Sequence, residues 1–392
     1  MTQITIHRGT RQIGGCVAEI AAEYSRVFID FGKNLPGVDT PASEIGGLTT
    51  ENGKNSALFL THYHGDHMGR LGDLLPEIPI YMGKTAKAIQ MNYVERTDLE
   101  NLPLFARIQT FQSLDRITVG DITVTPLMID HSAFDAYMFI IEADSKRILH
   151  TGDFRLHGVR GGKTLKMLAH YAKNIDYIIC EGTTMSRNGE PPMSEHTLRQ
   201  KAAAMMKDTK YVFVLCPTTN IDRIGAFYHA NPKGRLFVCD TYQKKQLNTV
   251  RKGHANKSSF YDFRYVCNYA PNLDQVMEEK GFCMLVRQKG YFQHVMERYK
   301  DNCLVLYSMW TGYLDERAKN QALVNFLAPY RGRMRVLHTS GHASPEDIRK
   351  LHETVTPKCG LIPIHTDTPE GFEELISAGQ VILLDDGEVR RI

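Results

Sequence analysis

The chain has 392 residues, 42% of them hydrophobic, which is enough for one large core or two ordinary ones and excludes a small disulfide-dependent scaffold. The N-terminal segment lacks the basic and apolar regions of a signal peptide, and no apolar run reaches the roughly 18 residues of a membrane span, so we expect a soluble, cytoplasmic protein without a membrane partner. The eight cysteines form no C-x-x-C pair and should be reduced thiols, and a net charge of +3 does not by itself predict nucleic-acid binding.

Short β-type runs separated by turn residues dominate the first 180 residues or so. The expected strands are 4–9, 17–23, 26–32, 57–62, 78–83, 121–129, 136–144, 147–154 and 176–182. Two helices are expected among them, at 65–75 and 85–96. This arrangement predicts sheets that are covered by a few helices.

From about residue 193, strands and helices alternate, which predicts a parallel, doubly wound sheet. Helices are expected at 194–207, 220–230, 241–252 and 313–327, and strands at 211–217, 235–240 and 303–308. Local basic clusters at 155–166, 244–257 and 331–335 are interpreted as solvated faces.

The last part of the chain returns to a mixed pattern. We expect strands at 334–340, 360–365 and 380–386 and helices at 344–355 and 369–378. The helix at 344–355 should open with a capping box between Ser344 and Asp347, with Pro345 at its first position. The predicted organisation is one domain formed by residues 1–192 and 336–392, with residues 193–335 inserted into it.

A compact group of potential metal ligands follows the apolar run at 57–60: His62, His64, Asp66 and His67. His62 and His64 alternate at a strand end, so their side chains should point the same way, and Gly65 permits a tight turn. Imidazole suits zinc and carboxylate oxygen suits a harder cation, so this group can hold two cations. The alternative is a loop with polar surface residues, but four ligand types in register favour a metal site.

The motif T-H-Y-H-G-D-H at 61–67 resembles the signature of the metallo-β-lactamase superfamily, an αββα sandwich of metal-dependent hydrolases. The resemblance implies further ligands at strand ends, and Asp130-His131 and Thr151-Gly152-Asp153-Phe154 occur in the family's order. Carried over by residue, one metal would be bound by His62, His64 and His131, the other by Asp66 and His67, and Asp153 would bridge them.

Asp30 resembles the family's early aspartate, which hydrogen-bonds a ligand histidine and fixes its orientation. The alternative for Asp30 is an aspartate that caps a turn before Gly32.

Three later motifs resemble those of the β-CASP group, the nucleic-acid-cleaving branch of the superfamily: C-E-G-T-T with Glu181, H-T-S-G-H-A-S with His342, and P-I-H with His365. The resemblance spans essentially the whole chain and is greatest to ribonucleases of the RNase J type. The C-terminal domain that those enzymes usually carry is expected to be absent from this sequence. The resemblance implies an α/β fold: an αββα metallo-β-lactamase sandwich with an inserted doubly wound parallel α/β (β-CASP) domain. Thr366-Asp367 and the segment 281–315 depart from the family pattern.

The resemblance also implies roles for these residues. His365 would complete the second metal site, His342 would stabilise the phosphoryl group or protonate the leaving oxygen, and Glu181 would orient His342. The expected catalytic group is therefore Asp66, His342 and Glu181.

Two helix starts are expected to bind phosphate, because N–H groups and the helix dipole favour anions there. The first comprises Ser340, Gly341, His342, Ala343 and Ser344. The second comprises Thr218, Thr219, Asn220 and Arg223, within a segment that resembles the family's Asn-x-x-Arg motif. The alternative for Glu181 or Arg223 alone is a surface ion pair.

The implied activity is cleavage of single-stranded RNA in a 5′-to-3′ exonuclease mode, an endonuclease mode or both. Two divalent cations, zinc in the first place and manganese as the alternative, would clamp a phosphoryl oxygen and lower the pKa of a water. Three alternatives stay open: a β-CASP nuclease for DNA, which His365 disfavours, a small-molecule metallohydrolase, and an inactive RNA-binding module. The oligomeric state is not predicted.

Overall fold

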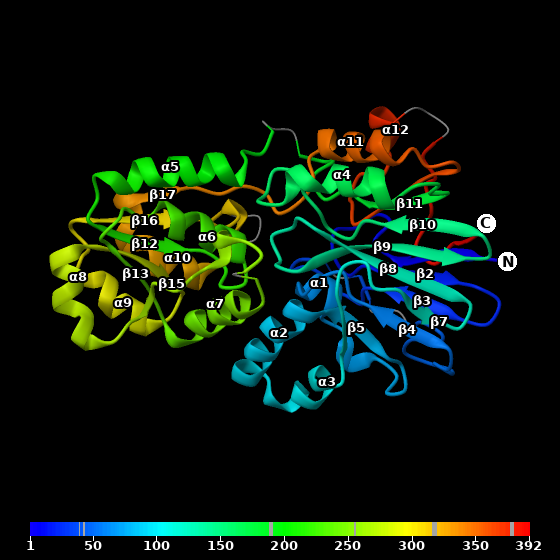
Figure 1. Ribbon diagram of the computed structural model, residues 1–392, viewed down its shortest axis with the longest axis horizontal. Coiled ribbons are helices and arrows are strands. Elements are labelled where there is room, and N and C mark those ends of the chain that lie inside the picture. The colour runs from blue at the N-terminus through cyan, green and yellow to red at the C-terminus, as the bar shows by residue number, and fades with distance from the viewer. Residues whose placement is uncertain (39, 42–43, 188–190, 255, 316–319, 377–379) are drawn as a thin grey trace. The chain divides into compact units, whose positions relative to one another are not determined.

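The computed structural model describes residues 1–38, 40–41, 44–187, 191–254, 256–315, 320–376 and 380–392. The chain forms two compact units (Figure 1), of which unit 1 is Met1–Pro191 with Gly341–Ile392 and unit 2 is Pro192–Ser340. The second boundary lies after residue 340 instead of after residue 335, because β17 (Met334–Val336) pairs with β16 (Cys303–Tyr307) inside the sheet of unit 2. The expected strand 334–340 therefore belongs to the inserted unit.

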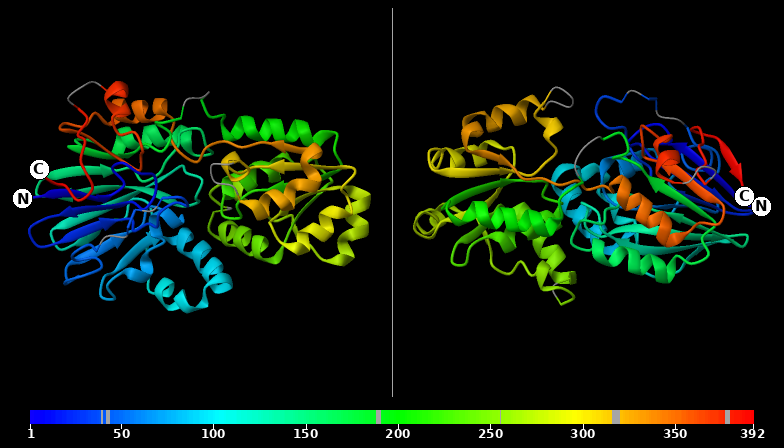
Figure 2. Two further views of the ribbon diagram at one scale, coloured as in Figure 1. Left: turned by 180° about the vertical axis from the view of Figure 1, so that it is seen from behind. Right: turned by 90° about the horizontal axis from the view of Figure 1, so that it is seen from above.

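Unit 1 contains two sheets. The first has the order β19-β1-β2-β3-β4-β5-β6, with β1 (Gln3–Arg8), β2 (Val17–Ala21), β3 (Arg26–Ile29), β4 (Ser56–Phe59), β5 (Ile80–Gly83), β6 (Gln109–Phe111) and β19 (Val389–Arg391). The second has the order β18-β11-β10-β9-β8-β7, with β7 (Ile117–Val119), β8 (Ile122–Ile129), β9 (Ala136–Ala143), β10 (Lys146–His150), β11 (Tyr177–Glu181) and β18 (Gly360–Ile364). Because β19 pairs with β1, the two chain ends lie side by side (Figure 2).

The main core of unit 1 combines inward-facing side chains of both sheets, such as Ile4, Ile20 and Phe59 of the first and Phe139 and Ile179 of the second. The opposite face of the second sheet packs under α4 (Gly161–Tyr171), α11 (Pro345–Val355) and α12 (Gly371–Leu375), which lie along one side of it in Figure 1. The other helices of unit 1 among the described residues are α1 (Gly65–Met68), α2 (Lys84–Thr97) and α3 (Leu102–Ala106). The sandwich of sheets between helical layers confirms the predicted fold class.

Two expectations for unit 1 were wrong. The helix expected at 65–75 is the single turn α1, which ends at the C-cap Gly69, followed by a 3₁₀ turn at Leu71–Asp73. The segment 380–386 forms only a single bridge, between Leu361 and Val381, and the strand that ends the chain is β19.

Unit 2 is built on one parallel sheet with the order β14-β13-β15-β12-β16-β17, as the alternating pattern predicted. The remaining strands are β12 (Tyr211–Leu215), β13 (Leu236–Cys239), β14 (Val266–Asn268) and β15 (Phe282–Val286). Its helices are α5 (Glu195–Lys207), α6 (Ile221–Ala230), α7 (Thr241–His254), α8 (Asp274–Lys280), α9 (Gly290–Glu297) and α10 (Gln321–Leu327). The helix expected at 313–327 corresponds to the shorter helix α10, and residues 316–319 of the expected helix lie outside the described part.

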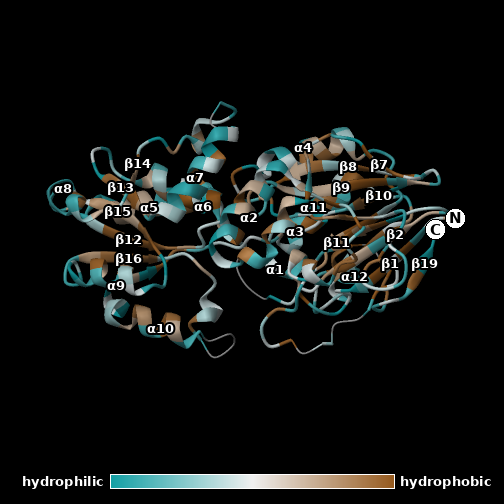
Figure 3. Ribbon diagram, turned by 90° about the horizontal axis from the view of Figure 1, so that it is seen from below, coloured by the Kyte–Doolittle hydropathy of each residue, from teal (hydrophilic) through white to brown (hydrophobic). Residues whose placement is uncertain are grey.

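Hydrophobic residues concentrate along the strands of each unit (Figure 3). Unit 2 has its own core, in which Phe213, Met284 and Val305 of the sheet pack against helix residues such as Phe292 and Leu323. Among the helices of the described ranges, none combines the length and the apolar character needed to cross a membrane.

Candidate metal centre

The potential ligands lie where strands of unit 1 end. His62 follows β4, His131 follows β8, and Asp153 follows β10. β10, β11 and β18 are neighbouring parallel strands, so Asp153, Glu181 and His365 reach the same sheet edge. The structure thus brings together residues that are up to 303 positions apart, from His62 to His365, in one unit.

The first cluster consists of His62, His64 and His131. Nδ1 of His64 lies 3.0 Å from Nε2 of His62 and 3.2 Å from Nε2 of His131. Nδ1 of His131 donates to the carbonyl oxygen of Gly341 at 2.7 Å, which leaves a lone pair on its Nε2. Nitrogen atoms of three imidazoles therefore converge on one point.

Asp30 fixes the tautomer of two histidines. Its carboxylate accepts the N–H (2.7 Å) and the hydroxyl (2.7 Å) of Thr61, so the Thr61 oxygen is an acceptor for Nδ1 of His62 at 3.0 Å. The same carboxylate accepts from Nδ1 of His67 at 2.7 Å. His62 therefore presents an unprotonated Nε2 to the first cluster, and His67 directs its Nε2 to the second. Burial would lower the pKa of His67, but the carboxylates of Asp153, Asp30 and Asp66 outweigh it and raise that pKa, so a cation would have to displace the Nε2 proton. This geometry agrees with the expected role of Asp30.

The second cluster consists of Asp66, His67 and His365, with Asp153 between the two clusters. Nε2 of His365 lies 3.3 Å from Oδ2 of Asp66, and its Nδ1 lies 2.7 Å from the hydroxyl of Thr183. Oδ2 of Asp153 lies 3.1 Å from Nε2 of His67 and 3.9 Å from Nε2 of His62, so one oxygen faces both clusters.

Burial sets the protonation of the first cluster. It lowers the pKa of His64 to about 4, and it lowers the pKa of His62 and His131 well below the ordinary value, with the neighbouring imidazoles adding to the effect. Burial would raise the pKa of Asp153, but the surrounding histidines outweigh it and hold that pKa well below its usual range. Three neutral imidazoles beside an ionised carboxylate are a donor set suited to a borderline cation such as zinc.

The donor atoms also lack the partners that buried polar atoms need. Among the described residues, neither carboxylate oxygen of Asp153 nor Nε2 of His67 makes a hydrogen bond of acceptable geometry, although all three atoms are buried and Nε2 of His67 lies 3.1 Å from Oδ2 of Asp153. Unsatisfied buried polar atoms are rare because they cost free energy, and a cation would satisfy them. The residues present therefore fit divalent metal ions.

His342 lies beside this centre and is held by Glu181. Nδ1 of His342 is 3.1 Å from Oε2 of Glu181 and 3.4 Å from Oδ2 of Asp153. Burial alone would lower the pKa of His342, but these two carboxylates outweigh it and raise that pKa. Glu181 also accepts the N–H of Phe154 at 2.8 Å, so it links the turn after β10 to the turn that carries His342.

The turn before α11 differs from the expected phosphate cradle. Its capping box is confirmed, with Ser344 and Asp347 bonded reciprocally and Pro345 at the first position. However, the N–H of Ala343 is directed to Oε1 of Glu181 (3.4 Å) and that of Ser344 to Oδ2 of Asp347 (3.2 Å). The N–H groups of these two residues are thus already bound by carboxylates, and the carbonyl oxygen of Gly341 accepts from His131. Ser340 is the last residue of unit 2.

Arg223 was expected to meet a phosphate, and the structure does not support this. Its side chain is fully buried and its guanidinium binds both carboxylate oxygens of Glu195, at 2.8 to 3.1 Å. It also donates to Ser308 and to the carbonyl oxygen of Thr339. Arg223 is therefore the ion-pair partner of Glu195, as in the alternative given above, but the pair is buried and not at the surface.

The other residues of that segment, Thr218, Thr219 and Asn220, lie in unit 2 between β12 and α6. Asn220 is the N-cap of α6, and its side chain accepts from the N–H of Arg223 at 3.2 Å. This cap satisfies one of the free N–H groups of the helix start with the chain's own oxygen.

The sequence analysis missed several supporting residues. Thr61 and Thr183 position ligand histidines, and the position of Thr61 next to the histidine motif was the available signal. Asp130, next to His131, forms a fully buried ion pair with Arg155 (Nε to Oδ1, 2.7 Å). This pair joins the strand end that carries His131 to the one that carries Asp153, and no local sequence pattern indicated it.

The backbone of the centre is locally strained. Asp30 has φ 62° and His365 has φ 55°, a left-handed conformation that residues other than glycine rarely adopt. Gly32 allows a close approach of two segments, because a Cβ atom there would lie 1.6 Å from the carbonyl oxygen of Asp66. Strain of this kind is maintained by surrounding contacts and concentrates at functional sites.

Comparison with known proteins supports this arrangement. Residues 26–215 match the family model described as beta-lactamase superfamily domain. The chain is 24% identical to a ribonuclease J of Helicobacter pylori over 98% of its length, and 22% identical to that of Mycoplasma pneumoniae over 99%. It spans 60% of the Helicobacter pylori protein and 74% of the Mycoplasma pneumoniae protein.

A ribonuclease J of Sinorhizobium meliloti is 26% identical over 85% of this chain and 62% of its own length. A solved structure, described as a protein of unknown function from Enterococcus faecalis V583, covers 99% of both chains with a TM-score of 0.78 and 24% identity, which shows the fold. Residues 26–215 therefore resemble a beta-lactamase superfamily domain, in a chain that is similar over nearly its whole length to ribonuclease J proteins.

Proposed function

We propose that this protein is a metal-dependent ribonuclease that hydrolyses phosphodiester bonds of single-stranded RNA. The observation that carries the proposal is the position of Asp153, whose buried and unsatisfied carboxylate lies between two ligand clusters. The resemblance to ribonuclease J proteins supports RNA as the substrate.

In this proposal, His62, His64 and His131 hold one divalent ion, Asp66, His67 and His365 hold the other, and Asp153 contacts both. Zinc is favoured by the imidazole-rich donor set, and manganese is the alternative. Two such ions, when bound, polarise a phosphoryl oxygen and lower the pKa of a water to near neutrality.

The protein's own residues would orient the ligand histidines and donate a proton to the leaving oxygen. Asp30 keeps His62 and His67 in the tautomer that binds a cation, and Glu181 holds Nδ1 of His342. With Nδ1 held by Glu181, Nε2 is the nitrogen of His342 that would donate a proton to the leaving oxygen or a hydrogen bond to the phosphoryl group. A raised pKa favours the protonated imidazole that this step requires.

The test is cleavage of a 5′-labelled single-stranded RNA by the purified chain, with its metal content measured in parallel. We expect about two divalent ions per chain, loss of cleavage on chelation, and recovery when zinc or manganese is added. Asp66→Asn should abolish cleavage, whereas the matched variant Asp73→Asn, at an exposed carboxylate of the same segment, should cleave normally. Equal cleavage by ion-free protein would refute the proposal.

The same assay separates the finer alternatives. RNA with a 5′-monophosphate, RNA with a 5′-triphosphate and circular RNA distinguish trimming from the 5′ end from internal cutting. Single-stranded DNA of the same sequence is the control for the type of nucleic acid, and faster cleavage of DNA would move the assignment to a DNA nuclease.

A further inference from the structure

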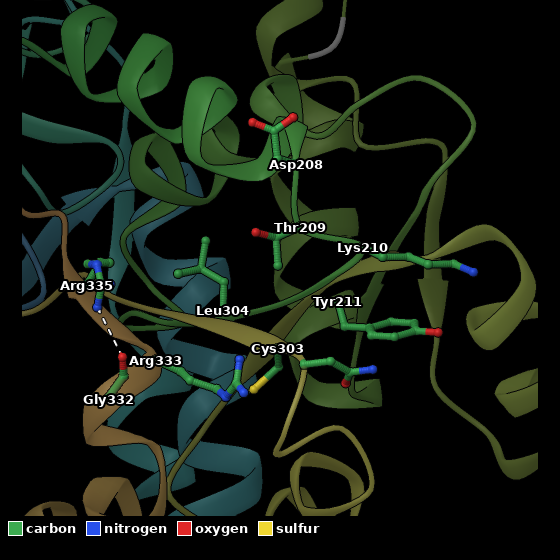
Figure 4. A pocket seen from close by; sticks show the side chains of 10 residues that line it. Asp208, Thr209, Lys210, Tyr211, Cys303, Leu304, Gly332, Arg333 and Arg335 are labelled. Carbon is green, nitrogen blue, oxygen red and sulfur yellow. Dashed lines mark hydrogen bonds between the residues drawn. The ribbon is translucent and has the colours of Figure 1, made fainter.

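A groove with unneutralised positive charge lies in unit 2, which contains none of the candidate metal ligands described above. Figure 4 shows its lining, and its volume is about 560 Å³. The lining residues lie at or just before the starts of three neighbouring parallel strands: Asp208, Thr209, Lys210 and Tyr211 for β12, Asn302, Cys303 and Leu304 for β16, and Gly332, Arg333 and Arg335 for β17. The groove is thus at the amino-terminal edge of the sheet, whereas ligands of such sheets usually bind at the carboxyl edge.

The charges of the lining are strongly unbalanced. Lys210, Arg333 and Arg335 are exposed, and none forms an ion pair with another described residue. Arg335 is oriented instead by the carbonyl oxygens of Met334 (2.8 Å) and Gly332 (3.4 Å), which leaves its charge unneutralised. Asp208 is the one carboxylate of the lining, and its side chain points away from the arginines (Figure 4).

The flanking residues strengthen this imbalance. The immediate sequence neighbours of the lining add the cations Lys207 and Arg331 and one further carboxylate, Asp301. Mutual repulsion of cations that are not neutralised is unfavourable in the free protein, so this concentration of charge calls for an anionic partner.

The cations are spread out instead of converging. Lys210 precedes β12 and Arg333 precedes β17, two strand spacings away in the order β12-β16-β17, which corresponds to about 10 Å. In Figure 4 Lys210 and Arg335 lie at opposite sides of the lining, and Arg333 lies between them. A single small anion would be met best by converging cations, whereas a row of cations matches a row of phosphates.

We propose that this groove binds the sugar-phosphate backbone of single-stranded RNA, as a second contact for the substrate on unit 2. The proposal rests on the proposed function for the choice of RNA over other polyanions. Thr209 and Asn302 supply neutral hydrogen-bonding groups, and the three cations supply a contact that is independent of base sequence. The expected binding is therefore non-specific and strongly dependent on salt.

The experiment measures RNA binding without cleavage. A fluorescein-labelled 20-nucleotide single-stranded RNA is titrated with the full-length, chelator-treated chain from 50 to 200 mM salt, and the anisotropy gives the affinity. The test variant combines Lys210→Gln, Arg333→Gln and Arg335→Gln, all at exposed positions. The matched control combines Lys54→Gln, Lys166→Gln and Lys173→Gln, which remove the same charge from exposed sites of unit 1. Urea unfolding confirms that both variants keep the wild-type stability.

Each phosphate contact on a single strand contributes about 0.7 to the slope of log affinity against log salt, so the test variant should lose about 2 from that slope. Over this salt range the wild type should then lose about 16-fold more affinity than the variant. The control should keep the wild-type slope. An unchanged slope in the test variant, or an equal loss in the control, would overturn the groove as an RNA site.

Two further outcomes separate this proposal from the proposed function. If the wild type shows no metal-dependent cleavage but binds RNA with a groove-dependent slope, the groove stands and the ribonuclease assignment falls. If cleavage occurs and the groove variant binds RNA as the wild type does, the ribonuclease stands and the groove falls. An oligoglutamate peptide of equal charge that binds the groove more tightly than the RNA would also overturn the proposal, in favour of an acidic protein segment.

Discussion

The carboxylate of Asp30 accepts a hydrogen bond from Nδ1 of His67 at 2.7 Å, and this contact directs Nε2 of His67 toward Asp153. Through the Thr61 hydroxyl, the same carboxylate also sets the tautomer of His62. One buried side chain outside both ligand clusters thus prepares a ligand for each of them.

Replacement of Asp30 by asparagine should therefore weaken metal binding at both sites. Oδ2 of Asp30 accepts from both the Thr61 hydroxyl and Nδ1 of His67, and Oδ1 accepts from the N–H of Thr61. The amide has only one acceptor oxygen, so its NH2 group must face one of these sets of donors, and either orientation disturbs the contacts that orient the two histidines. We expect affinity for zinc to fall about 10- to 100-fold, as measured by competition with a chromogenic chelator. Thr61→Val should weaken only the site that contains His62, because His67 keeps its direct contact. Equal effects of the two variants on both sites would contradict the relay through Thr61.

Glu181→Gln should reduce cleavage without removing the metals. The variant loses the negative charge beside Nδ1 of His342 but keeps an acceptor for the N–H of Phe154. If His342 acts as proposed, kcat should fall about 10²- to 10⁴-fold, the usual range for loss of a proton-transfer group, while the metal content stays at the wild-type value. Loss of metal together with activity would instead assign Glu181 to the metal site.

The buried ion pair of Arg155 and Asp130 should stabilise the fold, and the stability losses of the two single variants should not be additive. Arg155→Met leaves the carboxylate of Asp130 buried and unpaired, and we expect a loss of about 3–5 kcal/mol in the free energy of unfolding. The double variant with Asp130→Asn should lose less than the sum of the single variants, by about 0.5–3 kcal/mol. Urea unfolding measures all three.

The exposed ion pair of Arg349 and Glu346 is the control for the comparison of the Arg155 and Asp130 variants. Nη2 of Arg349 lies 2.7 Å from Oε1 of Glu346, and the two side chains are 41% and 49% exposed. Arg349→Met should change the stability by no more than about 0.5–1 kcal/mol, because solvent screens such a pair. A similar loss for the buried and the exposed arginine would show that the buried pair has no special role.

His150 should make metal-free protein less stable in acid. Burial lowers its pKa from 6.5 to about 4, so below pH 6.5 the unfolded chain binds a proton that the folded protein does not. The contribution to stability is complete above pH 6.5, falls by up to about 1.4 kcal/mol per pH unit, and is lost near pH 4. His150→Gln should therefore show a weaker loss of stability between pH 7 and pH 5 than the wild type. The exposed His170→Gln should follow the wild type.

The ligand residues were predictable because their signal is local. His62, His64, Asp66 and His67 lie within six positions between the end of β4 and the end of α1, so the chain brings them together without any long-range pairing. The order of later strand ends then indicated His131, Asp153 and His365, although only the parallel pairing of β10, β11 and β18 brings Asp153, Glu181 and His365 to one edge.

What the sequence could not reveal depends on partners far along the chain. The charge of Arg223 is neutralised by Glu195, 28 positions earlier in the sequence. The N–H of Ala343 donates to Glu181, 162 positions earlier. The local sequence of the strand at 334–336 does not indicate to which unit it belongs. Only its pairing with β16 assigns it to unit 2. Likewise, the groove at the amino-terminal edge combines three segments, and their basic residues looked like ordinary solvated surface when taken one at a time.

The insertion of unit 2 between β11 and β18 has a consequence for the growing polypeptide. During translation, His62, His64, His131 and Asp153 are synthesised before the inserted unit. His342 and His365 are synthesised only after it. The proposed site of His62, His64 and His131 therefore has its ligands before unit 2 is made, whereas the proposed second site has to wait for β18 to pair with β11. Even the orientation of His131 is settled late, since its Nδ1 partner is the carbonyl of Gly341.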